Sequence, residues 1–456
     1  MNDLLFTLVV VIAGFVVANF CLARFDKGES MLLWVSLWAH VGSAIAQVLV
    51  TTYYFEGGGD MLSYHSYGAK IAHMMADDFF YIGGHVLKLI FQLDNQFPFA
   101  TLGGGNPTGT LEGLTAVMCF LLNDSLYAAC VLVSFVSFAG KLAIYQTLRD
   151  AMPVRYHRRM LVASMLVPSA VFWTSGVTKE AFAITGLGFM FYGLSRFVYE
   201  KGDGLVPLLG GALLVGLIKP YVLFPFVLAG GLWYYASRSM PKTGGLSIKP
   251  FYLALGVGGG FGALLLLGQL FPTFSIRNLG ASAARLQALG TTSGSSYAMG
   301  DGTADSLTGQ LAFAPFALFS ALFRPMFFEV RNAVMLINAV ETTIISVLLI
   351  QSIWTRKWAW MWATVLRSPI GMFCLAFTVL LGVGVGLGTT NLGTLSRYRV
   401  PMMPFYAALI LWWSAPAVVV AATRRIDRQV ARAGSRGLGL PVPNPPSALL
   451  SPQDLA

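Results

Sequence analysis

Long apolar segments with almost no charged residues among them constrain this chain more than any other feature. A helix needs about 20 largely apolar residues to cross the hydrocarbon core of a bilayer, and segments of about that length, or somewhat shorter, recur along the sequence. The sequence therefore predicts an all-α fold, a polytopic membrane helix bundle of about 11 transmembrane helices. The expected spans lie at roughly 4–23, 31–52, 126–147, 160–176, 180–199, 205–218, 220–236, 250–272, 333–353, 369–388 and 402–421.

The composition agrees with a membrane protein and excludes other classes. Only 11% of the 456 residues are charged, whereas a soluble domain has about 25%. This deficit excludes a soluble enzyme, a nucleic-acid-binding domain and a disordered chain. The four cysteines lie in apolar segments without a CxxC pair, which predicts buried side chains and no disulfide or metal framework. The histidines have no zinc-binding spacing, and the sequence contains no nucleotide-binding motif.

The basic residues predict how the bundle is oriented. Lysine and arginine concentrate in the short cytoplasmic loops of membrane proteins, and most of the 30 basic residues of this chain fall in alternate connections. We therefore expect the N-terminus outside and the C-terminus in the cytoplasm. Residues 1–433 would form the membrane domain, with the long outer loops at 53–125 and 273–332. Residues 434–456 are rich in Gly, Pro and Ser and predict a disordered cytoplasmic tail.

An acidic, glycine-rich segment follows the second expected span. Glu56 precedes three glycines, and Asp60, Tyr64 and His65 follow them. The glycines allow a sharp turn, and the apolar residues beyond recur at helical spacing, which predicts an amphipathic helix on the outer membrane surface. Asp60 is either a helix cap or a carboxylate that acts as a general base, with Glu56 nearby. Tyr64 and His65 become candidate substrate-binding residues.

Two lysines lie at the expected outer boundary of the membrane. Lys179 and Glu180 separate two apolar segments, and Lys219 precedes a proline. Charges at membrane depth are costly, and they are rare unless they are paired or face a cavity. The alternative is a lysine whose ammonium group extends to the water at the membrane surface. We take Glu180 as a candidate catalytic carboxylate, and Lys179 and Lys219 as candidate phosphate-binding residues.

Two further segments combine cations with prolines. The first contains Arg324, Glu329 and Arg331, and the second contains Arg397 and Arg399 just before the last expected span. Each cation taken alone is explained as an interfacial anchor. Taken together on one face of the membrane, these residues predict a basic pocket for a phosphate or pyrophosphate head group.

In their order along the chain, these motifs resemble those of bacterial integral-membrane glycosyltransferases of the GT-C type, in the branch associated with surface polysaccharides. The order is an Asp after an early span, Pro-x4-Trp-x5-Lys-Glu, Lys-Pro, Arg-Pro-x3-Glu and Arg-Tyr-Arg-x-Pro-x2-Pro, over roughly residues 50–415. Members of that family transfer a sugar from a polyprenyl-phosphate donor on the extracytoplasmic side of the inner (cytoplasmic) membrane. The resemblance implies that Asp60 is the base and that Arg397 and Arg399 contact phosphate. One departure is that the acidic loop follows the second span here, and commonly the first in the family.

The residue types fit the chemistry that the resemblance implies. Sugar transfer needs a carboxylate to take the proton of the acceptor hydroxyl and cations to stabilise the departing phosphate. The expected partners are a lipid-linked sugar donor, membrane lipid and a glycan, lipid or protein acceptor, with no nucleic acid. The sequence assigns no cofactor and no metal ligand, and a requirement for a divalent metal stays open.

Two other functions stay open at this stage. One is a surface-polysaccharide polymerase or ligase, which shares the lipid-linked donor and the position of the site. The other is a transporter or flippase for lipid-linked glycans, which is expected to have an internal repeat and polar sites near the middle of the membrane. Lys141 and Glu341 are the strongest mid-span charges, and the sequence has no evident repeat.

Overall fold

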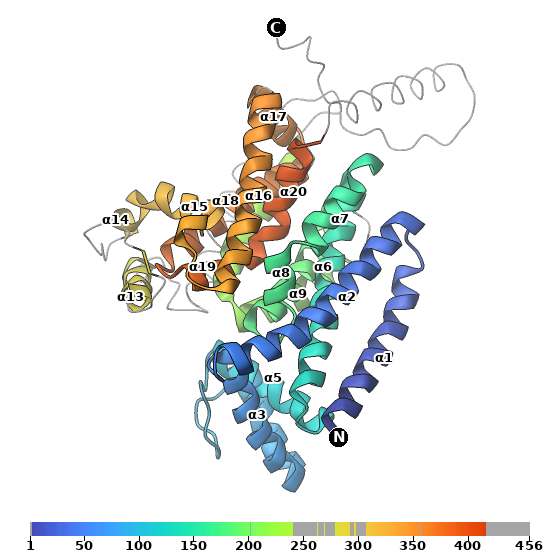
Figure 1. The fold of residues 1–456 in the computed structure, drawn as a ribbon, viewed down its shortest axis with the longest axis vertical. Helices are drawn as coiled ribbons and strands as arrows, with labels where there is room; N and C mark the ends of the chain where they lie inside the picture. Colours follow the sequence, from blue (N-terminus) through green and yellow to red (C-terminus); the bar gives the residue numbers. More distant parts are fainter. Residues whose placement is uncertain are drawn as a thin grey trace.

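The structure is a computed structural model that describes residues 2–200, 202–239, 262, 269, 279–291, 296–297, 307–356 and 358–415. These parts are helical throughout, and an isolated bridge between Ser296 and Asn391 is the only strand-like pairing in them (Figure 1). The predicted all-α class is therefore confirmed. The expected span at 250–272, apart from two isolated residues, and the tail at 434–456 lie outside the described residues.

Long apolar helices dominate the described part of the chain. Six of them are long and apolar enough to cross a membrane, as expected for a membrane protein. They are α1 (Asn2–Leu22), α2 (Lys27–Leu49) with its extension η1 (Val50–Tyr54), α6 (Leu126–Ala151), α9 (Lys179–Val198), α16 (Ala333–Thr355) and α18 (Pro369–Leu387).

Shorter helices lie at the other expected spans that fall within the described residues, so a bundle of eleven spans stays a prediction. The expected span at 160–176 is divided into two helices by Pro168, whose ring cannot continue the preceding helix. The shorter helices are α3 (Asp60–Asp77), α4 (Phe79–Ile90), α5 (Pro107–Leu122), η2 (Val154–Tyr156), α7 (His157–Met165), α8 (Pro168–Trp173), α10 (Leu205–Ile218), η3 (Pro220–Val222), α11 (Leu223–Ser239), α13 (Leu279–Thr291), α14 (Leu307–Ala312), α15 (Ala314–Phe323), η5 (Phe327–Glu329), α17 (Trp358–Leu366), α19 (Leu392–Tyr398), η6 (Val400–Met402) and α20 (Met403–Trp413).

The outer surface of the bundle is apolar where the long helices lie. Leu4 and Phe20 at opposite ends of α1 each leave 77% of their surface exposed, and Ile12 between them is also exposed. Soluble proteins rarely expose apolar patches of this extent. The exposed face of α1 is therefore suited to contact with lipid.

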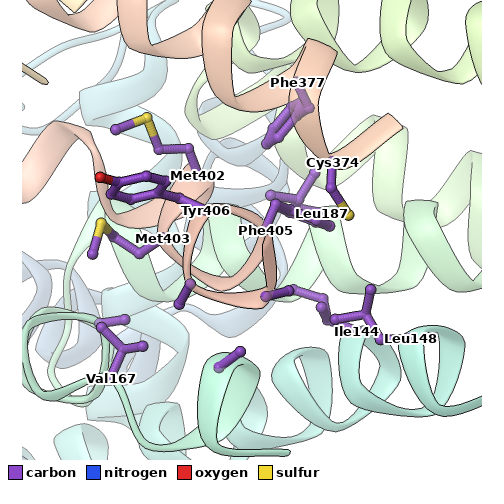
Figure 2. Packing of buried hydrophobic residues seen from close by; sticks show 14 of the residues in the cluster. Ile144, Leu148, Val167, Leu187, Cys374, Phe377, Met402, Met403, Phe405 and Tyr406 are labelled. Carbon is purple, nitrogen blue, oxygen red and sulfur yellow. The ribbon is translucent and has the colours of Figure 1, made fainter. Parts of the chain in front are cut away.

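The main hydrophobic core lies where α6, α9, α18 and α20 meet. Figure 2 shows Ile144 of α6, Leu187 of α9, Phe377 of α18 and Phe405 of α20 within this cluster. The rings of Phe377 and Phe405 lie edge to face, with their centroids 5.0 Å apart. The cluster also joins α6 to α18 and α20, which are more than 200 residues away in the sequence.

The helix expected on the outer membrane surface is α3, and its apolar face is covered by protein. Tyr64, Ile71 and Met75 are buried, and the position of a Cβ on Gly68 would lie only 3.0 Å from the backbone nitrogen of Ala116 on α5. The predicted helix is therefore present, but its apolar stripe packs largely against α5.

Glycines bring α6 and α9 into backbone contact. A Cβ on Gly188 of α9 would lie 1.9 Å from the carbonyl oxygen of Gly140 on α6. We expect Gly188→Ala to separate the two helices and to lower stability by about 1–3 kcal/mol, as overpacking does in well-packed cores. The measurement is the temperature at which the detergent-solubilised protein loses its monodisperse gel-filtration peak.

Gly210→Ala on α10 is the matched control, because a Cβ there would meet no atom within 4 Å. It makes the same chemical change in another apolar helix. Equal losses of stability in the two variants would contradict the close contact between α6 and α9.

Candidate functional site

Four residues singled out by sequence meet at one place in the fold. Asp60 is the first residue of α3, Glu180 lies in the first turn of α9, Lys219 connects α10 to η3, and Arg397 is in the last turn of α19. Pro220 ends α10 at Lys219, and the side chain of Thr178 caps the start of α9. Helix boundaries therefore place all four side chains. We call this group, with Lys179, the Glu180 cluster.

Glu180 is the centre of the cluster. Its side chain is fully buried, and its Oε1 accepts a hydrogen bond from Lys219 Nζ at 2.9 Å. Arg397 donates to both carboxylate oxygens, from Nε to Oε1 at 3.3 Å and from Nη2 to Oε2 at 3.2 Å. A buried carboxylate is stable only when its charge is paired and hydrogen-bonded. The two cations satisfy this requirement.

Arg397 connects the buried carboxylate to an exposed one. Its Nη1 donates to Asp60 Oδ2 at 3.1 Å, and its guanidinium lies 5.4 Å from the ring centroid of Trp173. Burial by itself would lower the pKa of Arg397, but the adjacent carboxylates of Glu180 and Asp60 raise it above its ordinary value. Arg397 is therefore charged at every physiological pH.

Asp60 keeps a carboxylate accessible at the edge of the cluster. Its side chain is 57% exposed. Gly59, and not Asp60, occupies the N-cap position of α3, and no side chain caps this helix end. The hypothesis that Asp60 serves as the cap of this helix therefore finds no hydrogen bond to support it. Asp60 directs its carboxylate to Arg397 instead.

Aromatic rings lie against each cation of the cluster. Lys219 Nζ is 4.8 Å from the ring centroid of Tyr398 and 5.8 Å from that of Tyr221. Lys179 Nζ donates to Thr108 Oγ1 at 2.8 Å and lies 6.0 Å from the centroid of the Tyr64 ring. Cation–π contacts of this kind stabilise partly desolvated charges.

The balance of charge favours an anionic ligand. Three cations, Lys179, Lys219 and Arg397, face two carboxylates, so the Glu180 cluster carries a net positive charge. Tyr64 adds a hydroxyl that stays protonated, because burial, together with the negative charge of Asp60, raises its pKa above the ordinary value.

The structure places Arg324, Glu329 and Arg399 in a separate group. Arg324 Nε donates to Glu329 Oε1 at 2.8 Å, and its guanidinium lies 4.1 Å from the centroid of the Tyr297 ring. Arg399 is only 1% exposed, and its Nη1 donates to the backbone oxygen of Arg324 at 2.7 Å. The guanidinium groups of Arg324 and Arg399 are therefore already bonded inside the protein. The predicted phosphate-binding cations do not all converge on one pocket.

The remaining candidates lie apart from the cluster. His65 Nε2 is 2.8 Å from the backbone oxygen of Asp124. Glu56 is exposed in a left-handed conformation with φ of 50°, and Arg331 is also exposed. Within the described residues, none of the three pairs with the Glu180 cluster.

Sequence reasoning did not select four residues that contact the cluster. Trp173 lies in the Pro-x4-Trp-x5-Lys-Glu motif and Tyr398 in the Arg-Tyr-Arg-x-Pro-x2-Pro motif, so their aromatic side chains were a usable signal. Tyr221 follows the Lys-Pro pair directly. Thr108 is the second residue of α5, and no local pattern marks it.

The carboxylates of the cluster do not form a ready metal site. Arg397 lies between Asp60 and Glu180 and bonds to both. In the part of the chain that the structure describes, no group of three or more His, Cys, Asp or Glu side chains is arranged to hold a metal ion.

Comparison with known proteins adds no assignment. No family model matches the chain, and no curated protein or solved structure matches it. The chemical character of the cluster follows from its own contacts.

The buried pair of Glu180 and Lys219 can be tested through stability. We expect Glu180→Ala to cost about 3–5 kcal/mol, since it leaves Lys219 and Arg397 without their shared buried carboxylate. The measurement is the thermal denaturation temperature in detergent. Glu200→Ala is the control, because Glu200 pairs with Arg238 at the surface, where ion pairs contribute little. An equal fall in both variants would contradict the central position of Glu180.

Proposed function

We propose that the protein is a membrane glycosyltransferase that moves a sugar from a polyprenyl-phosphate-linked donor to a glycan, lipid or protein acceptor. The observation that carries the proposal is the arrangement around Arg397. An exposed carboxylate, Asp60, and a buried one, Glu180, lie on either side of this guanidinium, and two lysines lie beside them. Transfer of a sugar from a lipid phosphate needs a proton acceptor and cations at neighbouring positions.

The burial of the two carboxylates suggests a division of roles. Asp60 is open to solvent and takes the proton of the acceptor hydroxyl. Glu180 is fully buried, so it is a poor base for an external substrate and instead holds Lys219 and Arg397 in place. Arg397 and Lys179 contact the donor phosphate and stabilise the negative charge that develops as the sugar leaves.

The apolar surface of the helices supports a lipid-linked donor. The long helices expose large apolar side chains, which suits a protein that lies within the bilayer. We place the Glu180 cluster at the extracytoplasmic boundary of the bacterial inner membrane, with the C-terminus in the cytoplasm. A polysaccharide polymerase or ligase would use the same donor and site, and it differs only in taking a growing glycan as acceptor.

Transport is supported by one observation, the presence of buried charges within the bundle. Lys141 and Glu341 are both buried. Lys141 donates to the backbone oxygen of Ala170 at 2.8 Å, and Glu341 accepts from Ser169. Groups that are bound to the backbone of a neighbouring helix do not exchange readily with a passing substrate. We therefore favour an enzyme over a carrier.

Asp60→Asn tests the role of Asp60 as general base. The amide is nearly isosteric with the carboxylate but takes no proton. We expect a fall of about 10²–10⁴-fold in sugar transfer, the range for loss of a general base, with normal expression. The measurement is the amount of lipid-linked sugar that accumulates in cells whose only copy of the protein is the variant.

Asp77→Asn is the matched control, because Asp77 ends the same helix and is exposed. It should behave like the unmodified protein. If Asp60→Asn retains more than about a third of the activity, the loss is far below the general-base range and the assignment of Asp60 fails.

Reporter fusions test the proposed orientation. A fusion after Arg159, which follows α6, should place the reporter in the cytoplasm, and one within α13 should place it outside. The expectation follows from the basic residues at the end of α6 and the start of α7. A periplasmic reporter after Arg159 would reverse the orientation and move the Glu180 cluster to the cytoplasmic side.

A further inference from the structure

A second buried carboxylate joins two of the elements that build the site. Glu341 lies on α16 and is almost fully buried. Its Oε2 accepts a hydrogen bond from the backbone nitrogen of Ser169 at 2.7 Å, and its Oε1 accepts one from the hydroxyl of Ser169 at 2.6 Å. Ser169 is the second residue of α8, so both oxygens of Glu341 hold the beginning of this short helix.

Glu341 also pairs with a residue at the end of α19. Arg399 Nη2 lies 3.7 Å from Glu341 Oε1 and donates to Thr342 Oγ1 at 3.1 Å. Arg399 directly follows α19, the helix that carries Arg397. One side chain of α16 is therefore bound both to α8 and to the residue that follows α19, and these three helices contact one another (Figure 1).

The two helices that Glu341 joins, α8 and α19, each supply one residue of a cation–π contact. Trp173 is the last residue of α8, and its ring lies against the guanidinium of Arg397 from α19. We propose that Glu341 is a positioning residue, which fixes α8 relative to α19 so that Arg397 is held on Trp173 and between Asp60 and Glu180. The importance of this position for catalysis rests on the proposed function, whereas the tie between the helices does not.

A buried lysine of another long helix also holds α8. Lys141 of α6 donates to the backbone oxygen of Ala170 at 2.8 Å, and it lies 3.0 Å from His40 Nε2. His40 Nδ1 is 2.7 Å from the backbone oxygen of Ser36, so Nδ1 donates there and Nε2 accepts from Lys141. The six-residue helix α8 is therefore fixed by side chains of two long helices, and Glu341 is the one that also reaches α19.

The interruption of the helix before α8 explains why side chains must bond to its backbone. Pro168 lacks a backbone N–H, and the turn between α7 and α8 leaves backbone groups without partners inside an apolar bundle. Ser36 Oγ donates to the free carbonyl of Met165 at 2.8 Å, and Glu341 accepts from the free nitrogen of Ser169. Glu341→Gln removes the charge that attracts Arg399 and replaces one of the two oxygens that accept from Ser169 by an amide nitrogen, so α8 and α19 are free to shift apart.

The experiment uses the full chain labelled with 5-fluorotryptophan in detergent micelles or nanodiscs. The chain has ten tryptophans, and comparison with Trp173→Phe identifies the ¹⁹F signal of Trp173. In Glu341→Gln we expect this signal to move or broaden, while the signal of Trp233, in the hydrophobic core, stays unchanged. Ser169→Ala removes only the hydroxyl bond and should move the Trp173 signal in the same direction by less.

Glu29→Gln is the matched control. Glu29 is as buried as Glu341 and also pairs with an arginine, Arg149, and with His157, but it contacts neither α8 nor α19. The proposal is overturned if Glu341→Gln leaves the Trp173 signal unchanged, or if Glu29→Gln changes it equally. If Glu341→Gln does not fold, Ser169→Ala decides, and an unchanged signal there overturns the proposal as well.

Sugar transfer in the same variants separates this proposal from the proposed function. A displacement of about 1 Å at a catalytic group lowers rates by about 10²-fold, so Glu341→Gln should lose about that much activity while Glu29→Gln retains it. If the Trp173 signal moves and sugar transfer is unchanged, the tie through Glu341 stands and the proposed role of Arg397 in transfer fails.

Discussion

A buried carboxylate in an apolar bundle imposes the arrangement around Glu180. Removing such a charge from water costs several kcal/mol, and the cost is offset only when cations and hydrogen bonds surround the carboxylate. Lys219 and Arg397 supply both. Because these residues come from the end of α10 and from α19, pairing with Glu180 fixes where each of those segments meets α9. The exposed carboxylate of Asp60 is then placed by the free end of the same guanidinium.

Several charged side chains inside the bundle share a second feature, which is that they lie at, or bind to, places where a helix is interrupted. Lys219 precedes the proline that ends α10, and Glu341 and Lys141 bind the short helix that follows Pro168. Interrupted helices leave backbone groups that cannot be satisfied by lipid. Buried side chains satisfy some of them here, and the interruptions in turn position side chains such as Trp173 at the candidate site. The buried polar residues and the irregular backbone therefore depend on each other.

The arginines near the candidate site differ in how accessible they are to a ligand. Arg397 is bound to two carboxylates, of which one is accessible, so a ligand phosphate can compete for it at the edge of the cluster. Glu329 closes off Arg324, and Glu341 and the backbone oxygen of Arg324 close off Arg399. A cation that is already satisfied inside the protein holds neighbouring segments together, whereas one that shares an exposed carboxylate stays accessible to a ligand. The proposed chemistry follows from this difference in accessibility.

The sequence by itself determined the all-α class, the approximate positions of the six long apolar helices and the residue types of the cluster. These follow from local properties: apolar segment length, proline positions and the rarity of charge at membrane depth. It did not determine which charges meet. Arg397 and Arg399 are two residues apart and look equivalent, yet one bonds to Asp60 and the other lies within 4 Å of Glu341. Only the tertiary structure decides this, because side chains two residues apart on a helical turn point in different directions.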